Sequence, residues 1–104
     1  MSDSNSSALS ELTVLDLSQH VAGAYTGKLL AAFGAEVIKV EPPGEGDVAR
    51  KVGPFPDNEV DPEASALYLY LNTGKQGLTL DISSDEGASV LKELVAQADV
   101  LVEN

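Results

Sequence analysis

The feature that most constrains the fold of this chain is a strand, helix and strand in close succession near the N-terminus. The apolar run Thr-Val-Leu-Asp-Leu at 13–17 predicts a buried strand, in which Asp16 is the polar exception. Residues 24–33 predict a helix, because apolar side chains recur there at helical spacing and Gly34 follows where a C-terminal cap belongs. A second strand is predicted at 36–40. A unit of this order, about 30 residues long, is typical of a right-handed parallel crossover.

The second half of the chain repeats the alternation of strand and helix after a long connecting loop. Residues 42–63 contain all five prolines and several acids, which indicates a loop. Residues 64–71 fit either a short helix or a strand, and the pattern does not decide between them. Strands are predicted at 77–82 and at 99–103.

The helix predicted between these last two strands is amphipathic. Ser83 and Glu86 have the spacing of a capping box, so we expect the helix to begin after Ser83. Its buried face is predicted to consist of four apolar residues: Val90, Leu91, Leu94 and Val95. Strands and helices in this order predict an α/β domain with an open, mostly parallel sheet.

Length, charge and composition exclude several classes of protein. The 104 residues suffice for one small domain. Seventeen acids against six Lys and Arg give a net charge of −11, which disfavours nucleic acid and anionic membrane surfaces as partners. There is no cysteine, no apolar run long enough to cross a membrane, and no signal-peptide pattern at the N-terminus. We therefore expect a cytoplasmic protein in which residues 1–10 form a disordered leader.

Two glycine-containing patterns suggest nucleotide-binding sites, but neither matches the full motif of such a site. Between Gly23 and Gly27 lie three residues, where a phosphate-binding loop has four, and Leu29 stands where that loop needs Ser or Thr. Glu41 ends a strand where an acid could bind the ribose of NAD, yet the glycine fingerprint of a dinucleotide site is absent from the preceding turn. The alternating acids of residues 57–63 are typical of a solvated loop.

Two further residues are candidates on weaker grounds. His20, the single histidine, follows the first predicted strand, where ligands bind in open α/β sheets, although a lone histidine is more often structural or merely exposed. Lys75 precedes a strand and is predicted to be a solvated turn lysine. No residues have the spacing of a metal site or of a nucleophile and its base, so neither a metal nor a catalytic residue is predicted.

Four stretches of the chain carry a resemblance to a known family. They are Val14-Leu-Asp-Leu-Ser18 with Ala22-Gly23; Leu29-Leu-Ala31 and Phe33-Gly-Ala-Glu-Val-Ile-Lys-Val-Glu-Pro-Pro-Gly44 with Gly46-Asp47; Leu71-Asn72 with Gly74-Lys75 and Leu78-Thr-Leu-Asp81; and Glu86-Gly87 with Ala98-Asp-Val-Leu-Val-Glu-Asn104. In this order and spacing they resemble the start of class III CoA-transferases, which include formyl-CoA transferase, carnitine CoA-transferase and α-methylacyl-CoA racemase. The resemblance covers residues 11–104.

The resemblance implies a Rossmann-like, CoA-binding N-terminal domain over residues 11–104 and an interlocked homodimer. It implies CoA or an acyl-CoA as substrate, with no permanently bound cofactor, and transfer of CoA to an acid through covalent intermediates on an aspartate. In the family that aspartate lies beyond the block ending at Asn104, so the chain is expected to be truncated and inactive alone. The alternatives are a non-catalytic module that associates with a partner chain, and an unrelated nucleotide-binding domain.

The resemblance also implies which residues contact CoA. These are Val21 and Ala22 after the first strand; Leu80, Asp81, Ile82 and Ser83 at the adenosine end; and Asn104 beside the pantetheine arm. The chain departs from the family at three positions: Ala24 replaces a usual proline, Pro42 an arginine found in some members, and Ser83 a usual lysine. Two cationic contacts are therefore missing, and we expect weakened CoA binding.

Overall fold

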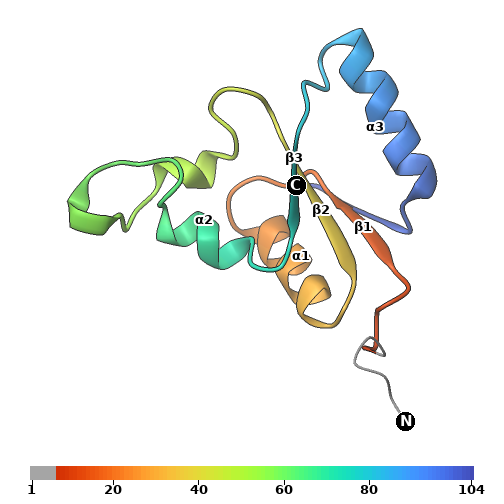
Figure 1. The fold of residues 1–104 in the computed structure, drawn as a ribbon, viewed down its shortest axis with the longest axis horizontal. Helices are drawn as coiled ribbons and strands as arrows, with labels where there is room; N and C mark the ends of the chain where they lie inside the picture. Colours follow the sequence, from red (N-terminus) through yellow and green to blue (C-terminus); the bar gives the residue numbers. More distant parts are fainter. Residues whose placement is uncertain (1–6) are drawn as a thin grey trace.

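The computed structural model describes residues 7–104, which fold around a single sheet of four parallel strands. The strands are β1 (Thr13–Asp16), β2 (Glu36–Glu41), β3 (Gln76–Thr79) and β4 (Val100–Val102). They lie in the order β3-β2-β1-β4, so the chain moves outward from β1 to β3 and then returns to the other side of β1 (Figure 1). This is the start of the doubly wound strand order and confirms the predicted α/β class with an open parallel sheet.

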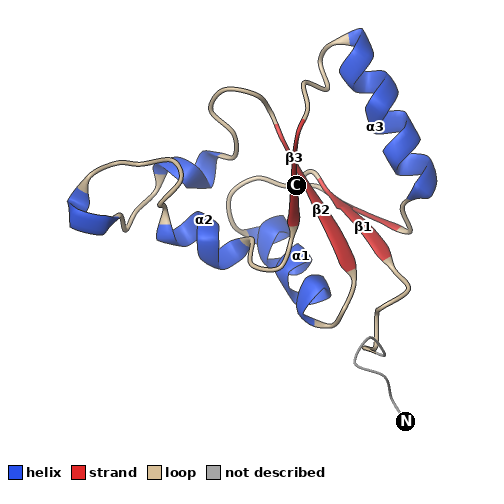
Figure 2. Ribbon diagram, viewed as in Figure 1, coloured by secondary structure: helices blue, strands red, loops and turns tan. Residues whose placement is uncertain are grey.

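Three helices connect and cover these strands. They are α1 (Ala22–Ala32), α2 (Ala66–Leu71) and α3 (Asp85–Gln97), with short 3-10 turns η1 (Val48–Lys51) and η2 (Pro56–Asn58) in the long loop. Parallel crossovers are right-handed, and the crossovers through α1 and α3 run in opposite directions across the sheet, so these helices cover opposite faces (Figure 2). None of the helices in residues 7–104 is long and apolar enough to cross a membrane.

The apolar core is small and centres on the two inner strands. Val14, Leu15 and Val37 are each at most 1% exposed. Around Val14 and Val37 pack Leu9, Leu12, Leu30, Ala31, Val100 and Val102. Because both faces of an inner parallel strand are covered, β1 is a nearly continuous apolar run, as its sequence predicted.

The first crossover forms much as predicted. Gly34 follows α1 with a φ of 106°, a conformation that favours glycine, and its N–H donates to Ala31 O at 3.0 Å. The helix begins at Ala22, two residues before the predicted start. Residues 64–71, which fit either a helix or a strand, form α2 from Ala66 onward, with Ser65 Oγ accepting the Tyr68 N–H at 3.2 Å.

Two predictions for α3 are wrong. The N-cap is Ser84, whose Oγ accepts the Gly87 N–H at 3.0 Å, because the Ser83 hydroxyl is already bonded to Asp81. The predicted buried face is also partly open, since Val90 is 40% and Val95 44% exposed. The apolar side of this long helix extends beyond the narrow sheet that it covers.

Several boundaries differ from those predicted. The strand expected at 77–82 ends at Thr79, and the strand expected at 99–103 spans only Val100–Val102. The first six residues of the predicted leader lie outside the described residues. Residues 7–10, expected to belong to it, instead form a turn in which the Leu9 N–H donates to Phe33 O at 2.9 Å and the Leu9 side chain packs against the core.

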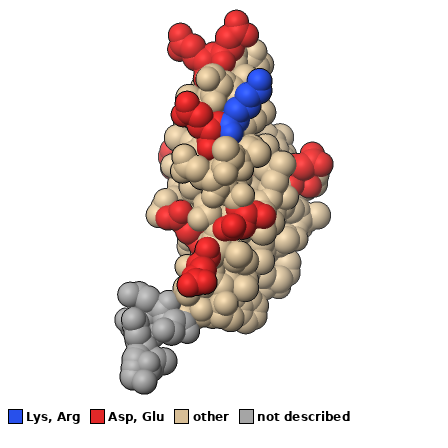
Figure 3. All heavy atoms as spheres, turned by 90° about the vertical axis from the view of Figure 1, so that its right-hand side faces the viewer, with Lys and Arg blue, Asp and Glu red and all other residues tan. Residues whose placement is uncertain are grey.

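The charge of the chain is concentrated on its surface. Acidic side chains are spread over the face that carries α3, and basic ones are scarce there (Figure 3). Two of the six Lys and Arg residues, Lys39 and Lys75, have side chains only 1% exposed. Each is paired with an equally buried aspartate, so the surface keeps the full surplus of acids that the composition gives.

Candidate functional site

The candidate site is the edge of the sheet at which the strands end. All four strands are parallel, so the segments that follow them meet at this edge. In open α/β sheets ligands bind there, at the point where the strand order reverses, which here lies between β1 and β4. All seven predicted contact residues follow a strand at this edge: Val21 and Ala22 after β1, Leu80, Asp81, Ile82 and Ser83 after β3, and Asn104 after β4.

Asn104 joins the end of β4 to the segment after β1. Its Oδ1 accepts the Gln19 N–H and its Nδ2 donates to Gln19 O, each at 3.0 Å. The Gln19 side chain in turn accepts the Val48 N–H at 3.2 Å, which ties in the segment after β2. Gln19, which the sequence analysis did not single out, thus links three loops two residues before Val21.

Beneath this edge lies a buried ion pair between Asp16 at the end of β1 and Lys75 just before β3. Lys75 Nζ is 2.6 Å from Asp16 Oδ2, and it also donates to Ala24 O at 2.9 Å and Asn72 Oδ1 at 2.8 Å. All three ammonium protons therefore have an acceptor. Burial lowers the pKa of Lys75, and the hydrogen bond to the Asp16 carboxylate opposes that shift. The prediction of a solvated turn lysine was wrong, because α1 and β1 enclose the side chain that the turn presents.

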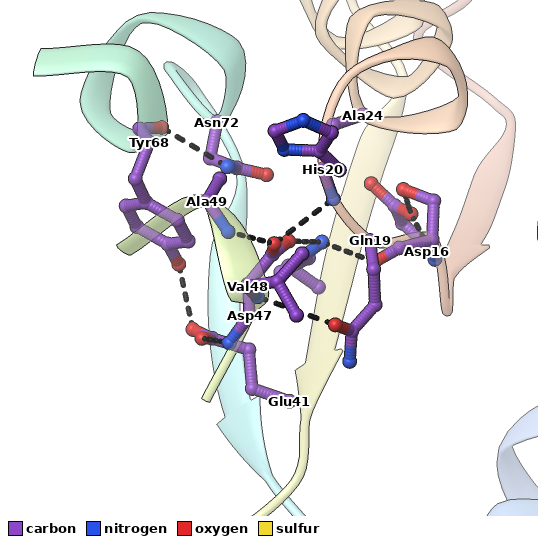
Figure 4. A network of polar contacts seen from close by, with 12 residues as sticks. Asp16, Gln19, His20, Ala24, Glu41, Asp47, Val48, Ala49, Tyr68 and Asn72 are labelled. Carbon is purple, nitrogen blue, oxygen red and sulfur yellow. Dashed lines mark hydrogen bonds and ion pairs between the residues drawn. The ribbon is translucent and has the colours of Figure 1, made fainter. Parts of the chain in front are cut away.

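A second buried pair joins Lys39 of β2 to Asp47 in the loop that follows (Figure 4). Lys39 Nζ lies 2.6 Å from Asp47 Oδ2 and 2.5 Å from Ser18 O. Asp47 Oδ1 accepts two backbone N–H groups, from His20 at 2.9 Å and from Ala49 at 2.8 Å. Since Asp47 is only 1% exposed, its carboxylate is fully occupied within the protein.

A third cluster surrounds Glu41 at the end of β2 (Figure 4). Arg50 donates to both Glu41 oxygens, at 2.7 and 2.8 Å, and Tyr68 Oη donates to Oε1 at 2.6 Å. The Asp47 N–H donates to Oε2 at 2.7 Å, which connects this cluster to the second pair. Burial alone would raise the pKa of Glu41, but the hydrogen bonds from Arg50, Tyr68 and the Asp47 amide outweigh it and lower the pKa to about 2. Burial and the same carboxylate raise the pKa of Tyr68.

The close approach of α1 to the first pair depends on a glycine. A Cβ at Gly27 would lie 2.8 Å from Asp16 Oδ2 and 3.1 Å from the Lys75 ammonium nitrogen. Neither group could move away without losing its buried partner. The helix therefore needs Gly27 here, although glycine is an unfavourable residue within a helix.

The N-terminus of α1 opens onto the edge. Val21 occupies the N-cap position, and its apolar side chain makes no capping hydrogen bond to the first turn of the helix. The first N–H groups of a helix have no partner within it and carry a partial positive charge. Val21 and Ala22 are both exposed, so this end of the helix is accessible.

The turn after β3 lies on the other side of β2. The Leu80 N–H donates to Glu41 O at 2.9 Å and so extends the pairing of β3 with β2. The Ser83 hydroxyl and N–H donate to Asp81 Oδ1 at 2.5 and 3.0 Å and lower the pKa of Asp81. Ile82 is 46% exposed. The structure thus places all seven predicted residues at one edge but in two groups, with the segment after β2 between them.

A hollow of about 150 Å³ lies beside that intervening segment, between the ends of β2 and β3. Arg50, Glu45 and Glu63 line it, together with Thr79. Arg50 is already paired with Glu41 and with Glu63 at 3.1 Å, so the hollow offers an anion no unpaired arginine.

The described residues offer neither a metal centre nor an unoccupied buried carboxylate. No group of three or more His, Asp or Glu within residues 7–104 is placed to hold a metal ion. The buried aspartates Asp16 and Asp47 are both bound in ion pairs. What the edge does offer is exposed backbone N–H groups at α1 and fixed loops on either side of β1.

Comparison with known proteins identifies CoA-transferases as relatives of this chain. The chain matches the profile of CoA-transferase family III over residues 9–104. It is 44% identical over 97 residues to the succinyl-CoA:mesaconate CoA-transferase of Haloarcula hispanica, covering 93% of this chain and 24% of that protein. It is also 44% identical over 98 residues to the formyl-CoA:oxalate CoA-transferase of Bradyrhizobium diazoefficiens, covering 93% of this chain and 22% of the relative. The chain thus spans about a quarter of the length of these relatives.

Solved structures agree with the sequence relatives. A CAIB/BAIF family protein from Brucella suis superposes with a TM-score of 0.82 at 39% identity, covering 94% of this chain and 26% of that one. The parallel sheet and its helices therefore have the arrangement found in a larger protein.

Proposed function

This chain belongs to CoA-transferase family III, and we propose that it supplies the CoA-binding part of an enzyme that transfers CoA between an acyl-CoA and a carboxylic acid. The observation that carries the proposal is the edge at which β1 and β4 end. There Asn104 and Gln19 hold the loops together beside the open N-terminus of α1. This is the position in an open α/β sheet at which a nucleotide-bearing ligand is expected.

CoA in this proposal lies along the edge. Its adenosine end rests on the turn formed by Leu80, Asp81, Ile82 and Ser83, and its pantetheine arm lies beside Asn104. Val21, Ala22 and the first N–H groups of α1 face the middle of the ligand, where backbone donors and the helix dipole favour phosphate oxygens. The activities of the relatives, which are named for succinyl-CoA and formyl-CoA, support CoA as the shared part of the substrate.

The nucleophilic aspartate in this proposal lies outside these 104 residues. Asp16 and Asp47 are buried and paired with lysines. Neither carboxylate is therefore free to attack a thioester. The relatives are about four times as long and leave room for a catalytic segment elsewhere. We accordingly assign no catalytic residue to this chain and expect it to show no transferase activity by itself.

The family resemblance also favours an interlocked homodimer, and we expect the protein to be cytoplasmic. A second candidate function is a non-catalytic module that associates with a partner chain. The apolar side chains of Val90, Val95 and Leu101, each at least 40% exposed on and beside α3, favour such an association.

The proposal is tested by titrating the chain with CoA and following backbone amide signals by NMR. The expected result is saturable shifts at Val21, Ala22, Asp81 and Ser83, with weak affinity, because neither Pro42 nor Ser83 provides a cation for the phosphates. Shifts confined to the acidic loop at 57–63, or no shifts at millimolar CoA, would contradict the proposed site.

A charge substitution sharpens this test. Replacing Ser83 with lysine should tighten CoA binding by less than roughly tenfold, because an exposed ion contact is worth at most about 1 kcal/mol and weakens with salt. Ser10→Lys is the matched control, since Ser10 is exposed and precedes β1 at the opposite end of the strands. Equal affinities of the two variants at low salt would show that the adenosine end of CoA does not lie at Ser83.

A further inference from the structure

His20 has an unusual backbone conformation at the candidate site. Its φ is 67°, in the left-handed region, and it lies between the end of β1 and the start of α1. A residue with a Cβ keeps this conformation only when its surroundings hold it there. The other non-glycine residues with positive φ in residues 7–104, Asp57 and Asn58, lie in the exposed acidic loop. His20 alone among the three adjoins the proposed CoA contacts.

The group that holds His20 is the buried carboxylate of Asp47. Asp47 Oδ1 accepts the His20 N–H at 2.9 Å across 27 residues of chain (Figure 4). The carboxylate is itself fixed from the other side by Lys39 at 2.6 Å, and the Asp47 N–H is bound to Glu41 at 2.7 Å. The acceptor that meets the His20 amide is therefore part of a rigid, buried network.

We propose that Asp47 is a positioning residue for CoA: by holding the His20 amide it fixes the left-handed turn that places Val21 and Ala22 at the ligand. This inference rests on the proposed function, because positioning Val21 and Ala22 matters for the ligand only if these residues contact CoA. It adds that the geometry of the CoA site is set from the loop after β2, by a residue that does not itself touch the ligand. Lys39 balances the charge of the buried Asp47 carboxylate.

A purely structural role for Asp47 is the competing explanation. Its Oδ1 also accepts the Ala49 N–H and so begins η1, and its negative charge neutralises Lys39. Removing the charge while the acceptor oxygen stays separates the ion pair from the hydrogen bonds of Asp47, and His20→Gly separates the His20 contact from the cap of η1. A buried ion pair replaced as a whole by uncharged residues of similar volume often leaves stability unchanged.

The experiment compares two double variants of the chain. Lys39→Met with Asp47→Asn removes both charges but leaves an oxygen for the His20 N–H. Lys39→Met with Asp47→Leu removes that oxygen as well. With CoA as the probe in the NMR titration, the first variant should bind within threefold of the unaltered chain. The second should bind at least tenfold more weakly, and its His20 amide should exchange with solvent at least tenfold faster.

A rescue distinguishes positioning from stability. Glycine adopts the left-handed conformation without strain, so adding His20→Gly to the double variant with Lys39→Met and Asp47→Leu should restore most of the CoA affinity. If leucine in place of Asp47 prevents folding, Lys39→Met with Asp47→Ala removes the same oxygen without added bulk. Equal CoA affinity in the asparagine and leucine variants, or failure of His20→Gly to rescue, would overturn the inference.

Failure of the proposed function gives a different result. If the unaltered chain does not bind CoA, the proposed function is wrong, and the positioning inference is then judged on structure alone. In that case the amide signals of Val21 and Ala22 should keep their positions in the asparagine variant and move in the leucine variant. Unchanged signals in both, or a rapidly exchanging His20 amide in the unaltered chain, would refute the role of Asp47.

Discussion

Replacing Glu41 with glutamine should lower the stability of the chain at neutral pH but not in acid. The carboxylate of Glu41, 7% exposed, accepts hydrogen bonds from Arg50, Tyr68 and the Asp47 amide, and its pKa is lowered from 4.5 to about 2. Each pKa unit corresponds to about 1.4 kcal/mol, so this carboxylate stabilises the fold by at most roughly 3–4 kcal/mol. Glutamine keeps one oxygen for Tyr68 but loses the charge that faces Arg50.

The direction of the pH dependence follows from the lowered pKa. Between pH 4.5 and about pH 2 the unfolded chain protonates Glu41 and the folded chain does not, so acid favours unfolding. The stabilisation is complete above pH 4.5 and is lost as the pH falls toward 2. The difference in free energy of unfolding between the unaltered chain and Glu41→Gln should therefore be about 2–3 kcal/mol at pH 7 and should approach zero in strong acid.

Urea unfolding followed by circular dichroism, at intervals from pH 7 to pH 2.5, measures this difference. Glu59→Gln is the matched control, because Glu59 is exposed and the same loss of charge there should change stability by less than about 0.5 kcal/mol. A difference for Glu41→Gln that stays constant across this range would refute the lowered pKa. A difference no larger than that of the control at pH 7 would refute the energetic role of the cluster.

Two further outcomes follow from packing and charge. Gly27→Ala should lower the free energy of unfolding by roughly 1–2 kcal/mol, because overpacking against Asp16 and its lysine partner outweighs the helix-favouring effect of alanine. Gly77→Ala, where an added Cβ meets nothing within 4 Å, should be nearly neutral in the same urea titration. The thermal midpoint should rise between 0.1 M and 1 M sodium chloride, because the Debye length falls from about 10 Å to about 3 Å and screens the surplus of acids. Neutralising the exposed Asp57 and Glu59 should reduce that rise, and a midpoint independent of salt would contradict the reasoning.

The order of the elements could be predicted from sequence because it depends on local periodicity. The apolar runs at β1 and β2 and the helical spacing of α1 are properties of consecutive residues. Gly34 marked the end of α1 because its left-handed conformation is a local requirement. Residues 64–71 remained ambiguous since α2 is so short that helix and strand periods cannot be told apart.

The buried pairs could be anticipated only in part. Asp16 and Lys39 each interrupt an apolar strand, and a charge at such a position requires a partner. The sequence does not identify the partner, since Lys75 lies 59 residues from Asp16 and is brought there by the sheet and α1 together. The same holds for Asn104 and Gln19, which are 85 residues apart. Nothing local distinguishes Lys75 from an ordinary turn lysine.

The use of cations inside the fold determines how this chain could bind an anionic ligand. Three of its six cations, Lys39, Arg50 and Lys75, are held in ion pairs beneath the strand ends. Of the other three, Lys28 lies over the Tyr70 ring and Lys92 in α3, while Lys51, in the segment after β2, is paired with Glu45. A phosphate at this edge would therefore be bound mainly by backbone N–H groups, whose direction is set by the chain path and cannot adjust as a lysine side chain can. Affinity then depends on how firmly the turn before α1 is held, which is why a buried carboxylate in a neighbouring loop can matter as much as a residue in contact with the ligand.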